Sequence, residues 1–201
     1  MLKIAVFVSG RGSNLKAILE TPNLKELVKV QAVFSDKIDC PAFTIAKKNS
    51  IKTFSVGKEA DISNEDLTSL LVSLGTELII LAGYLKLIPA ELIKNFKYKI
   101  INIHPALLPS FGGKGMYGLN VHKAVFNSSA QVSGATVHFV DETYDTGKII
   151  AQRCVDISGV NSPEEIAAIV LEYEHELLPY VVEKFALNKI KITEERIFIL
   201  P

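Results

Sequence analysis

Apolar runs and amphipathic stretches alternate along the first half of the chain. The apolar runs are short and rich in β-branched residues, which predicts five strands, at Leu2–Val8, Val30–Ser35, Ile51–Ser55, Glu77–Ala82 and Lys99–Ile103. A helical spacing of apolar positions predicts the segments between them, from about Asn14 and at Pro41–Asn49, Ser63–Leu74 and Pro89–Asn95. Strands that are apolar on both faces and alternate with helices indicate a parallel sheet covered on both sides.

The pattern changes in the second half. Leu119–Asn127 is amphipathic, and two alternating runs on either side of DETYDTG predict antiparallel strands at Ser133–Val140 and Lys148–Ile157. Ser162 and Pro163 start a long helix that reaches about Ala186, and Lys189–Thr193 with Arg196–Leu200 predicts a hairpin. We therefore expect an α/β fold. It is an open, mostly parallel twisted sheet with helices on both faces and an antiparallel C-terminal extension.

Composition and charge narrow the possible function classes. A chain of 201 residues fits one large domain. Lys+Arg and Asp+Glu balance at 22 each, so no broad basic field favours nucleic acid or an anionic membrane as a partner. Cys40 and Cys154 are too few for a secreted disulfide framework, and the sequence shows neither a membrane-length apolar run nor a signal-peptide cleavage site. We expect a soluble, cytoplasmic protein.

The segment Ser9–Asn14 reads SGRGSN, follows the first predicted strand and opens a helix. Glycines there allow close backbone approach, and the first N–H groups of a helix attract an anion. Leu15 stands where the dinucleotide fingerprint needs its third glycine, and the Lys-Ser/Thr ending of a Walker loop is missing. Two interpretations remain open, a site for a single phosphate and an ordinary turn in which Ser13 caps the helix.

Asn102 and His104 stand two residues apart at the carboxyl end of a predicted strand. Residues two apart in a strand point to the same face. An amide N–H and a protonated imidazole both stabilise an oxyanion, and a neutral imidazole accepts a proton. Pro105 stiffens the chain directly afterwards, which favours a functional role over a histidine that is merely satisfied by hydrogen bonds.

Asp141 and Asp145 lie in DETYDTG, where aspartates are common for backbone reasons alone. The other histidines, His122, His138 and His175, show no HExxH or CxxC spacing, so we expect no metal site. The loop Phe111–Gly118 holds four of the twelve glycines. Its composition fits both a mobile lid and a simple connector.

Taken in order, these segments resemble the glycinamide ribonucleotide formyltransferase family of folate-dependent enzymes. The resemblance rests on VFVSGRGSNLKAIL, LAGYLKLIP, NIHPALLPSF, SGATVHFVDETYDTGKIIAQ and EYEHELLP, and it covers nearly the whole chain. It implies one formyltransferase domain over residues 1–201. Residues 1 to about 104 would form a Rossmann-like phosphate-binding half, and about 105–201 the folate-side and C-terminal half. One departure is GGKGMYG, which is longer than the link common in the family.

The resemblance also implies roles for particular residues. The family's catalytic residues fall on Asn102, His104 and Asp145. Its phosphate loop falls on Gly12, Ser13 and Asn14, and its acidic substrate-binding residue on Glu174. Its folate contacts fall on Leu85, Lys86, Leu87, Ile88, Asn102, Val140 and Asp141.

The implied reaction transfers a formyl group from 10-formyltetrahydrofolate to the amine of glycinamide ribonucleotide in purine biosynthesis, without a metal. The amine attacks the formyl carbon and gives a tetrahedral oxyanion, which the amide and the imidazole suit. The alternatives are another formyl-folate enzyme of this fold, acting on a different amine or as a hydrolase, and a non-catalytic nucleotide-binding module. The tRNA-directed formyltransferases and the hydrolases carry an additional domain, so we expect neither.

Overall fold

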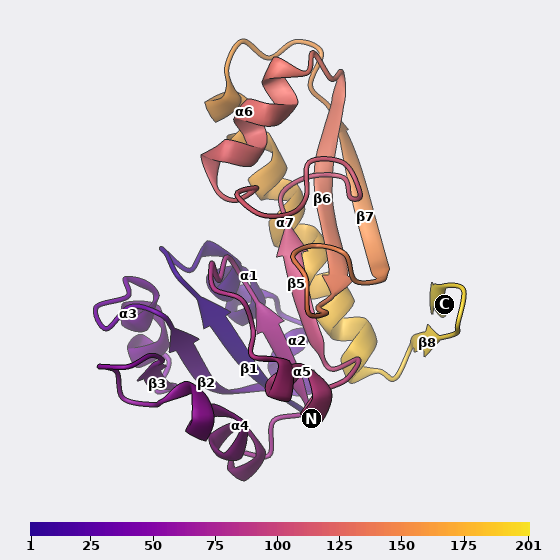
Figure 1. Cartoon of the computed structure of the whole chain (residues 1–201). Coiled ribbons are helices and arrows are strands. Elements are labelled where there is room, and N and C mark those ends of the chain that lie inside the picture. The colour runs from indigo at the N-terminus through magenta and orange to yellow at the C-terminus, as the bar shows by residue number, and fades with distance from the viewer.

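The computed structural model describes residues 1–201 and consists of one large sheet, seven helices and a small hairpin (Figure 1). The sheet has seven strands in the order β3-β2-β1-β4-β5-β6-β7. They are β1 (Leu2–Val8), β2 (Val28–Ser35), β3 (Lys52–Ser55), β4 (Leu78–Leu81), β5 (Ile100–His104), β6 (Val132–Phe139) and β7 (Ile149–Asp156). The strands β1 to β5 are parallel, and β6 is antiparallel to both of its neighbours. The expected fold class is confirmed.

The helices agree closely with the sequence pattern. They are α1 (Ser13–Glu20), α2 (Leu24–Leu27), α3 (Ala42–Lys48), α4 (Asn64–Ser73), α5 (Ala90–Asn95), α6 (Leu119–Asn127) and α7 (Pro163–Ala186). The side chains of Ser63 and Ser162 cap α4 and α7 by accepting N–H bonds, and Ser162 stands where the sequence predicted the start of the long helix. The short helix α2 was not predicted, because four residues are too few to show a helical period. No helix is both long and apolar enough to cross a membrane.

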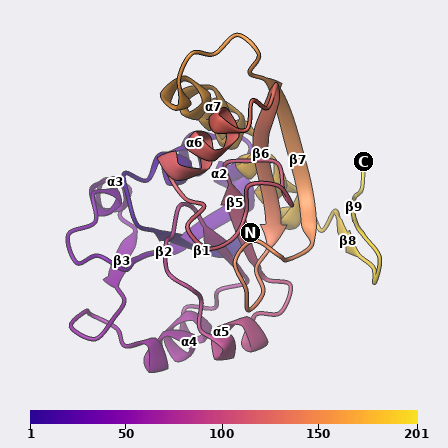
Figure 2. The ribbon, with the colours of Figure 1, turned by 45° about the horizontal axis from the view of Figure 1, so that its top comes forward.

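Two apolar cores lie on opposite faces of the sheet. In β1, Ile4 and Val6 belong to the larger core of 28 buried residues, and Ala5 and Phe7 to the smaller core of 13. The larger core includes residues of α1, α3 and α7, and the smaller one residues of α4 and α5. Figures 1 and 2 show α4 and α5 on the side of the sheet away from α7. Successive side chains of a strand point to opposite faces of the sheet, so each face has its own apolar core and its own covering helices.

Strand β5 joins the parallel and antiparallel parts of the sheet. It pairs with β4 in parallel and with β6 in antiparallel register, which places His138 opposite Asn102 and Thr136 opposite His104. Beyond β7, the predicted hairpin forms from β8 (Ile190–Ile192) and β9 (Ile197–Ile199) and stands beside the main body (Figure 1). Lys148 Nζ donates a hydrogen bond to the carbonyl of Thr193, 2.8 Å away, and attaches the hairpin to the start of β7.

Candidate active site

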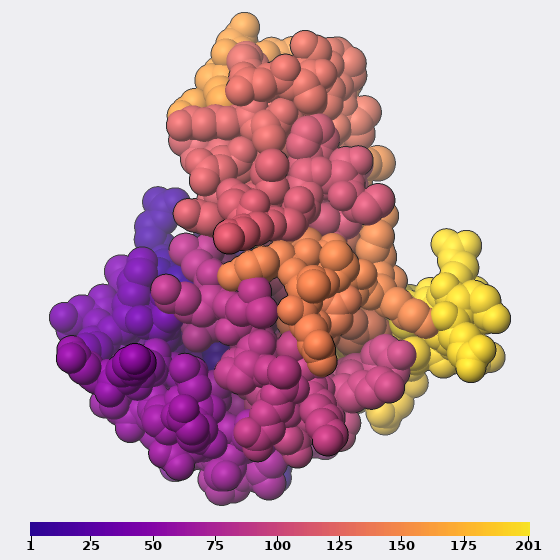
Figure 3. Space-filling model, in the orientation of Figure 1, coloured from indigo at the N-terminus to yellow at the C-terminus, as the bar shows by residue number.

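A cavity of about 700 Å³ lies where the carboxyl ends of β1, β4 and β5 meet the second half of the chain. Its walls come from the loops after β1, β4 and β5, the turn after β6, and the helices α6 and α7. In Figure 3 the turn after β6, in orange, lies beside magenta segments of the first half. Open parallel sheets bind ligands at the carboxyl ends of their strands, so this cavity is the candidate active site.

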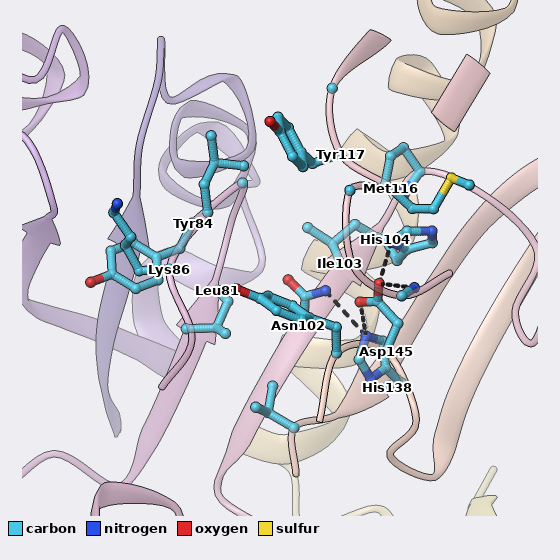
Figure 4. A pocket seen from close by; sticks show the side chains of 18 of the residues that line it. Leu81, Tyr84, Lys86, Asn102, Ile103, His104, Met116, Tyr117, His138 and Asp145 are labelled. Carbon is cyan, nitrogen blue, oxygen red and sulfur yellow. Dashed lines mark hydrogen bonds and ion pairs between the residues drawn. The ribbon is translucent and has the colours of Figure 1, made fainter. Parts of the chain in front are cut away.

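Asp145 lies between two histidines in the cavity wall (Figure 4). One carboxylate oxygen is 3.6 Å from His104 Nδ1, and the other is 3.5 Å from His138 Nε2. The N–H of Gly113 donates to the carboxylate at 2.9 Å, and His104 Nε2 donates to the carbonyl of Phe111 at 2.9 Å. A carbonyl only accepts, so this contact requires a proton on Nε2. The structure thus brings together His104 and Asp145, which the sequence had placed in different segments.

Asn102 lies next to this cluster on the same face of β5 as His104. Its Nδ2 donates a hydrogen bond to His138 Nε2 at 3.1 Å, while His138 Nδ1 donates to the carbonyl of Phe139 at 2.7 Å. One N–H of the amide is used in this way. The amide is only partly buried, so its other N–H remains available to a ligand in the cavity.

Burial and neighbouring charges act in opposite directions on the His104–Asp145 pair. Burial lowers the pKa of His104 below its usual value, although Asp145 and the Phe111 carbonyl favour the protonated ring. For Asp145, burial alone would raise the pKa. His138 when its ring is protonated, His104 and the Gly113 N–H outweigh it and leave the pKa of Asp145 below its ordinary value. Asp145 is therefore a stable carboxylate at neutral pH.

The turn after β6 is shaped to carry Asp145 into the cavity. Asp145 has a positive φ of 59°, a conformation that is uncommon outside glycine but tolerated by aspartate. Gly147 has no room for a side chain, since a Cβ there would lie 1.8 Å from the carbonyl oxygen of Phe139. The missing side chain lets the chain pass close to the end of β6.

The SGRGSN loop lies on the opposite side of the cavity. Gly12, with φ 78°, is the N-cap residue of α1 and no side chain caps the helix, so the alternative in which Ser13 is a cap is wrong. Of this loop, Arg11 and Asn14 line the cavity. A Cβ on Gly12 would lie 2.6 Å from that of Ala42, so α3 packs directly behind the loop.

Glu174 reaches the cavity from α7 and contacts the same loop. Its Oε2 accepts a hydrogen bond of 2.7 Å from Asn14 Nδ2, so the side chain of Asn14 faces a carboxyl group. Burial raises the pKa of Glu174 to about 7, with the Asn14 bond opposing the shift. The two residues are 160 positions apart in sequence, and the fold brings them together.

The residues expected on the folate side also line the cavity. They are Leu85, Lys86, Leu87, Ile88, Val140 and Asp141. The N–H of Leu85 donates to Ser9 Oγ at 3.0 Å, which ties this wall to the loop after β1. Asp141 accepts hydrogen bonds from Thr143 N–H at 3.1 Å and Thr146 Oγ1 at 2.7 Å, so its carboxylate stabilises the turn itself.

Comparison with known proteins agrees with this geometry. The family described as Formyl transferase matches residues 2–182. Phosphoribosylglycinamide formyltransferase of Haemophilus influenzae is 35% identical, over 96% of this chain and 92% of that protein. The chloroplastic enzyme of that name from Vigna unguiculata is 47% identical over 94% of this chain, which spans only 62% of its length. The crystal structure of phosphoribosylglycinamide formyltransferase from Anaplasma phagocytophilum has a TM-score of 0.89 and 32% identity, covering 100% of this chain and 95% of that one.

The chain belongs to the phosphoribosylglycinamide formyltransferase family. The cavity of this family member also contains polar residues that the sequence analysis did not place there. His138 is the main addition, because it contacts both Asn102 and Asp145. Arg11 and His122 also line the cavity. The only signal for His138 was a histidine inside an apolar run, SGATVHFV, where a buried imidazole needs hydrogen-bond partners.

Proposed function

We propose that this formyltransferase moves a formyl group from 10-formyltetrahydrofolate to the amine of glycinamide ribonucleotide, a step of purine biosynthesis. The observation that carries the proposal is the cluster of Asn102, His104 and Asp145 in one cavity. Residues of an anion-type loop and of the mainly apolar segment Leu85–Ile88 line the same cavity. The loop suits the phosphate of a small anionic amine, and the apolar segment suits a larger, flat folate.

The proposed reaction is a direct transfer. The amine nitrogen attacks the formyl carbon, and the carbonyl oxygen becomes an oxyanion. The bond from carbon to the folate nitrogen then breaks, and the proton lost by the amine goes to that leaving nitrogen through water. The free N–H of Asn102 donates to the oxyanion, and the His104 imidazolium stabilises it by its charge, each contribution worth about 3 kcal/mol. Asp145 favours the charged form of the imidazole and offsets part of the lowering of its pKa by burial.

The two substrates would occupy opposite walls. The ribonucleotide phosphate would bind at the N-terminus of α1, with Gly12, Ser13 and Asn14 supplying N–H groups and Arg11 a positive charge. Glu174 would contact the ribose or the glycinamide arm. The folate would lie along Leu85–Ile88 and the turn Val140–Asp145. In this proposal residues 1–201 act as one formyltransferase domain, and both halves contribute residues to each substrate site.

The proposal includes a cytoplasmic location and small-molecule partners only. Both cysteines, Cys40 and Cys154, are unpaired, which suits a reducing compartment. The equal numbers of acidic and basic residues leave no general attraction for nucleic acid.

A spectrophotometric assay of formyl transfer tests the proposal. We expect the folate product to form only when glycinamide ribonucleotide is present. Product formation without any amine would make the protein a hydrolase, and ribonucleotide binding without product would make it a binding module.

In the same assay we expect His104→Ala to lower kcat by about a hundredfold or more with little change in either KM, because the oxyanion exists only during the reaction. Unchanged turnover in the folded variant would remove His104 from the mechanism.

A further inference from the structure

The loop Phe111–Gly118 is bonded to both members of the His104–Asp145 pair through its backbone. The carbonyl of Phe111 accepts from His104 Nε2 at 2.9 Å, and the N–H of Gly113 donates to Asp145 Oδ2 at 2.9 Å. The same Oδ2 lies 3.6 Å from His104 Nδ1. Phe111 and Gly113, which flank Gly112, therefore contact the far side of the imidazole and one oxygen of its carboxylate partner.

Local geometry shows that this segment is tightly constrained. Phe111 has a positive φ of 54°, an unfavourable conformation for an aromatic residue, and its side chain packs against the larger apolar core. Gly112 lies so close to the pair that an added Cβ would be 3.1 Å from the Cβ of Asp145 and 2.5 Å from Leu108 Cδ2. Leu108 is itself buried, so little space exists for it to move. A strained backbone that the fold nevertheless holds in place is typical of functional sites.

We propose that Phe111–Gly113 is a positioning segment for the catalytic pair, and that Gly112 is the residue whose missing side chain lets it reach them. The inference rests on the proposed formyl transfer, which gives His104 and Asp145 their roles. Phe111–Gly113 touches neither substrate in this account. It orients the imidazole and the carboxylate relative to Asn102, so that the groups facing the formyl carbon are fixed before the substrates arrive.

The Phe111–Gly113 segment also favours the protonated state of the His104 imidazole. Both partners of the imidazole, the Phe111 carbonyl and the Asp145 carboxylate, are acceptors, so only the charged ring presents an N–H to each of them. His138 on β6 and His122 on α6 act in the opposite direction when they are charged. Because the Phe111 carbonyl raises the pKa of His104, losing this contact lowers it.

The test compares Gly112→Ala with Gly159→Ala in the full-length protein. Gly159 is a matched control, since a Cβ there meets nothing within 4 Å. For Gly112→Ala we expect kcat to fall about tenfold or more, with each KM changed less than about threefold. We also expect the basic limb of the kcat profile to move to lower pH, because the charged His104 is lost sooner. Gly159→Ala should behave like the wild type in all three measurements.

A second measurement does not depend on turnover. In the wild type, ¹⁵N NMR of the imidazoles should show a proton on His104 Nε2 in the neutral as well as the charged ring, and in Gly112→Ala the pKa of His104 should be lower. An unprotonated Nε2 in the wild type overturns the inference even if Gly112→Ala does not fold. An unchanged kcat and pH profile in folded Gly112→Ala also overturns it. A wild type that transfers no formyl group would instead reject the proposed function.

Discussion

The two halves of the molecule build their walls of the cavity from different groups. In the parallel half, the loops after β1 and β4 contribute mainly apolar side chains and the two cations Arg11 and Lys86. In the antiparallel half, the turn after β6 and the helix α7 contribute Asp145 and Glu174, carboxyl groups with shifted pKa values. Strand β5, with Asn102 and His104, lies between them.

This difference follows from sheet geometry. Parallel strands end together at one edge, so their loops form a surface with exposed N–H groups that suits binding. An antiparallel turn lies beside an adjacent strand, and its side chains meet those of that strand at short range. The comparison therefore predicts that changes in the loop after β1 alter KM, and that changes at Asp145 alter kcat and pH dependence.

The strongest test of this division is Asp145→Asn. The amide has nearly the same shape but no charge, so the pKa of His104 should fall further below its usual value. We expect kcat to drop about a thousandfold, with both KM values nearly unchanged, and the pH–rate profile to shift. Steady-state kinetics from pH 5 to 9 check this. A large rise in KM with normal kcat would contradict the division.

Glu174→Gln tests whether a carboxyl group in the antiparallel half makes the stability of the folded protein depend on pH. The pKa of Glu174 is about 7 in the folded protein against 4.5 unfolded, so the folded state binds more protons between these values. Stability is then greatest below about pH 4.5 and is lost as the pH rises to about 7, by about 3 kcal/mol. We expect Glu174→Gln to remove this loss while keeping an acceptor for Asn14. Denaturant unfolding at pH 5 and pH 8 measures it, with the exposed Glu172→Gln on the same helix as the control.

Most of the fold was predictable because local patterns decide it. The predicted strand Leu2–Val8 and the helix Leu119–Asn127 have the observed bounds, since each is a periodic segment limited by turn residues. The four-residue helix α2 shows no such pattern. The contacts of His138 were not predictable either, because they depend on the antiparallel register and on an irregularity between Val137 and His138.

The candidate site also has a part that was predictable from the sequence and a part that was not. Asn102 and His104 could be paired from sequence, since two residues apart in a strand means one face. Three contacts needed the tertiary structure: Asn14 with Glu174, His104 with the Phe111 carbonyl, and Asp145 with the Gly113 N–H. Two of these involve backbone groups, which carry no side-chain signal in the sequence.

Gly12→Val tests the parallel half. The backbone at Gly12 has a φ of 78°, and a side chain there would collide with Ala42, so the loop has to move away from α3. We expect the KM for glycinamide ribonucleotide to rise about tenfold, equivalent to about 1.4 kcal/mol of binding, with kcat and the KM for the folate nearly unchanged. Gly10→Ala is the control, because a Cβ at Gly10 meets nothing within 4 Å. Equal increases for both substrates would indicate a general folding defect instead.

Asp141→Asn should have the smallest effect, and it sharpens the comparison inside a single turn. Asp141 and Asp145 are four residues apart, yet Asp141 bonds to Thr143 and Thr146 within the turn, whereas Asp145 faces two histidines. An asparagine oxygen still accepts the Thr143 N–H bond, so we expect kcat within about threefold of the wild type and a slight loss of stability. Assaying the two variants side by side separates a carboxylate that shapes a turn from one that holds a charged imidazole. If Asp141→Asn were the inactive variant, the turn would have to rearrange on substrate binding, and the acid–base role would pass from Asp145 to Asp141.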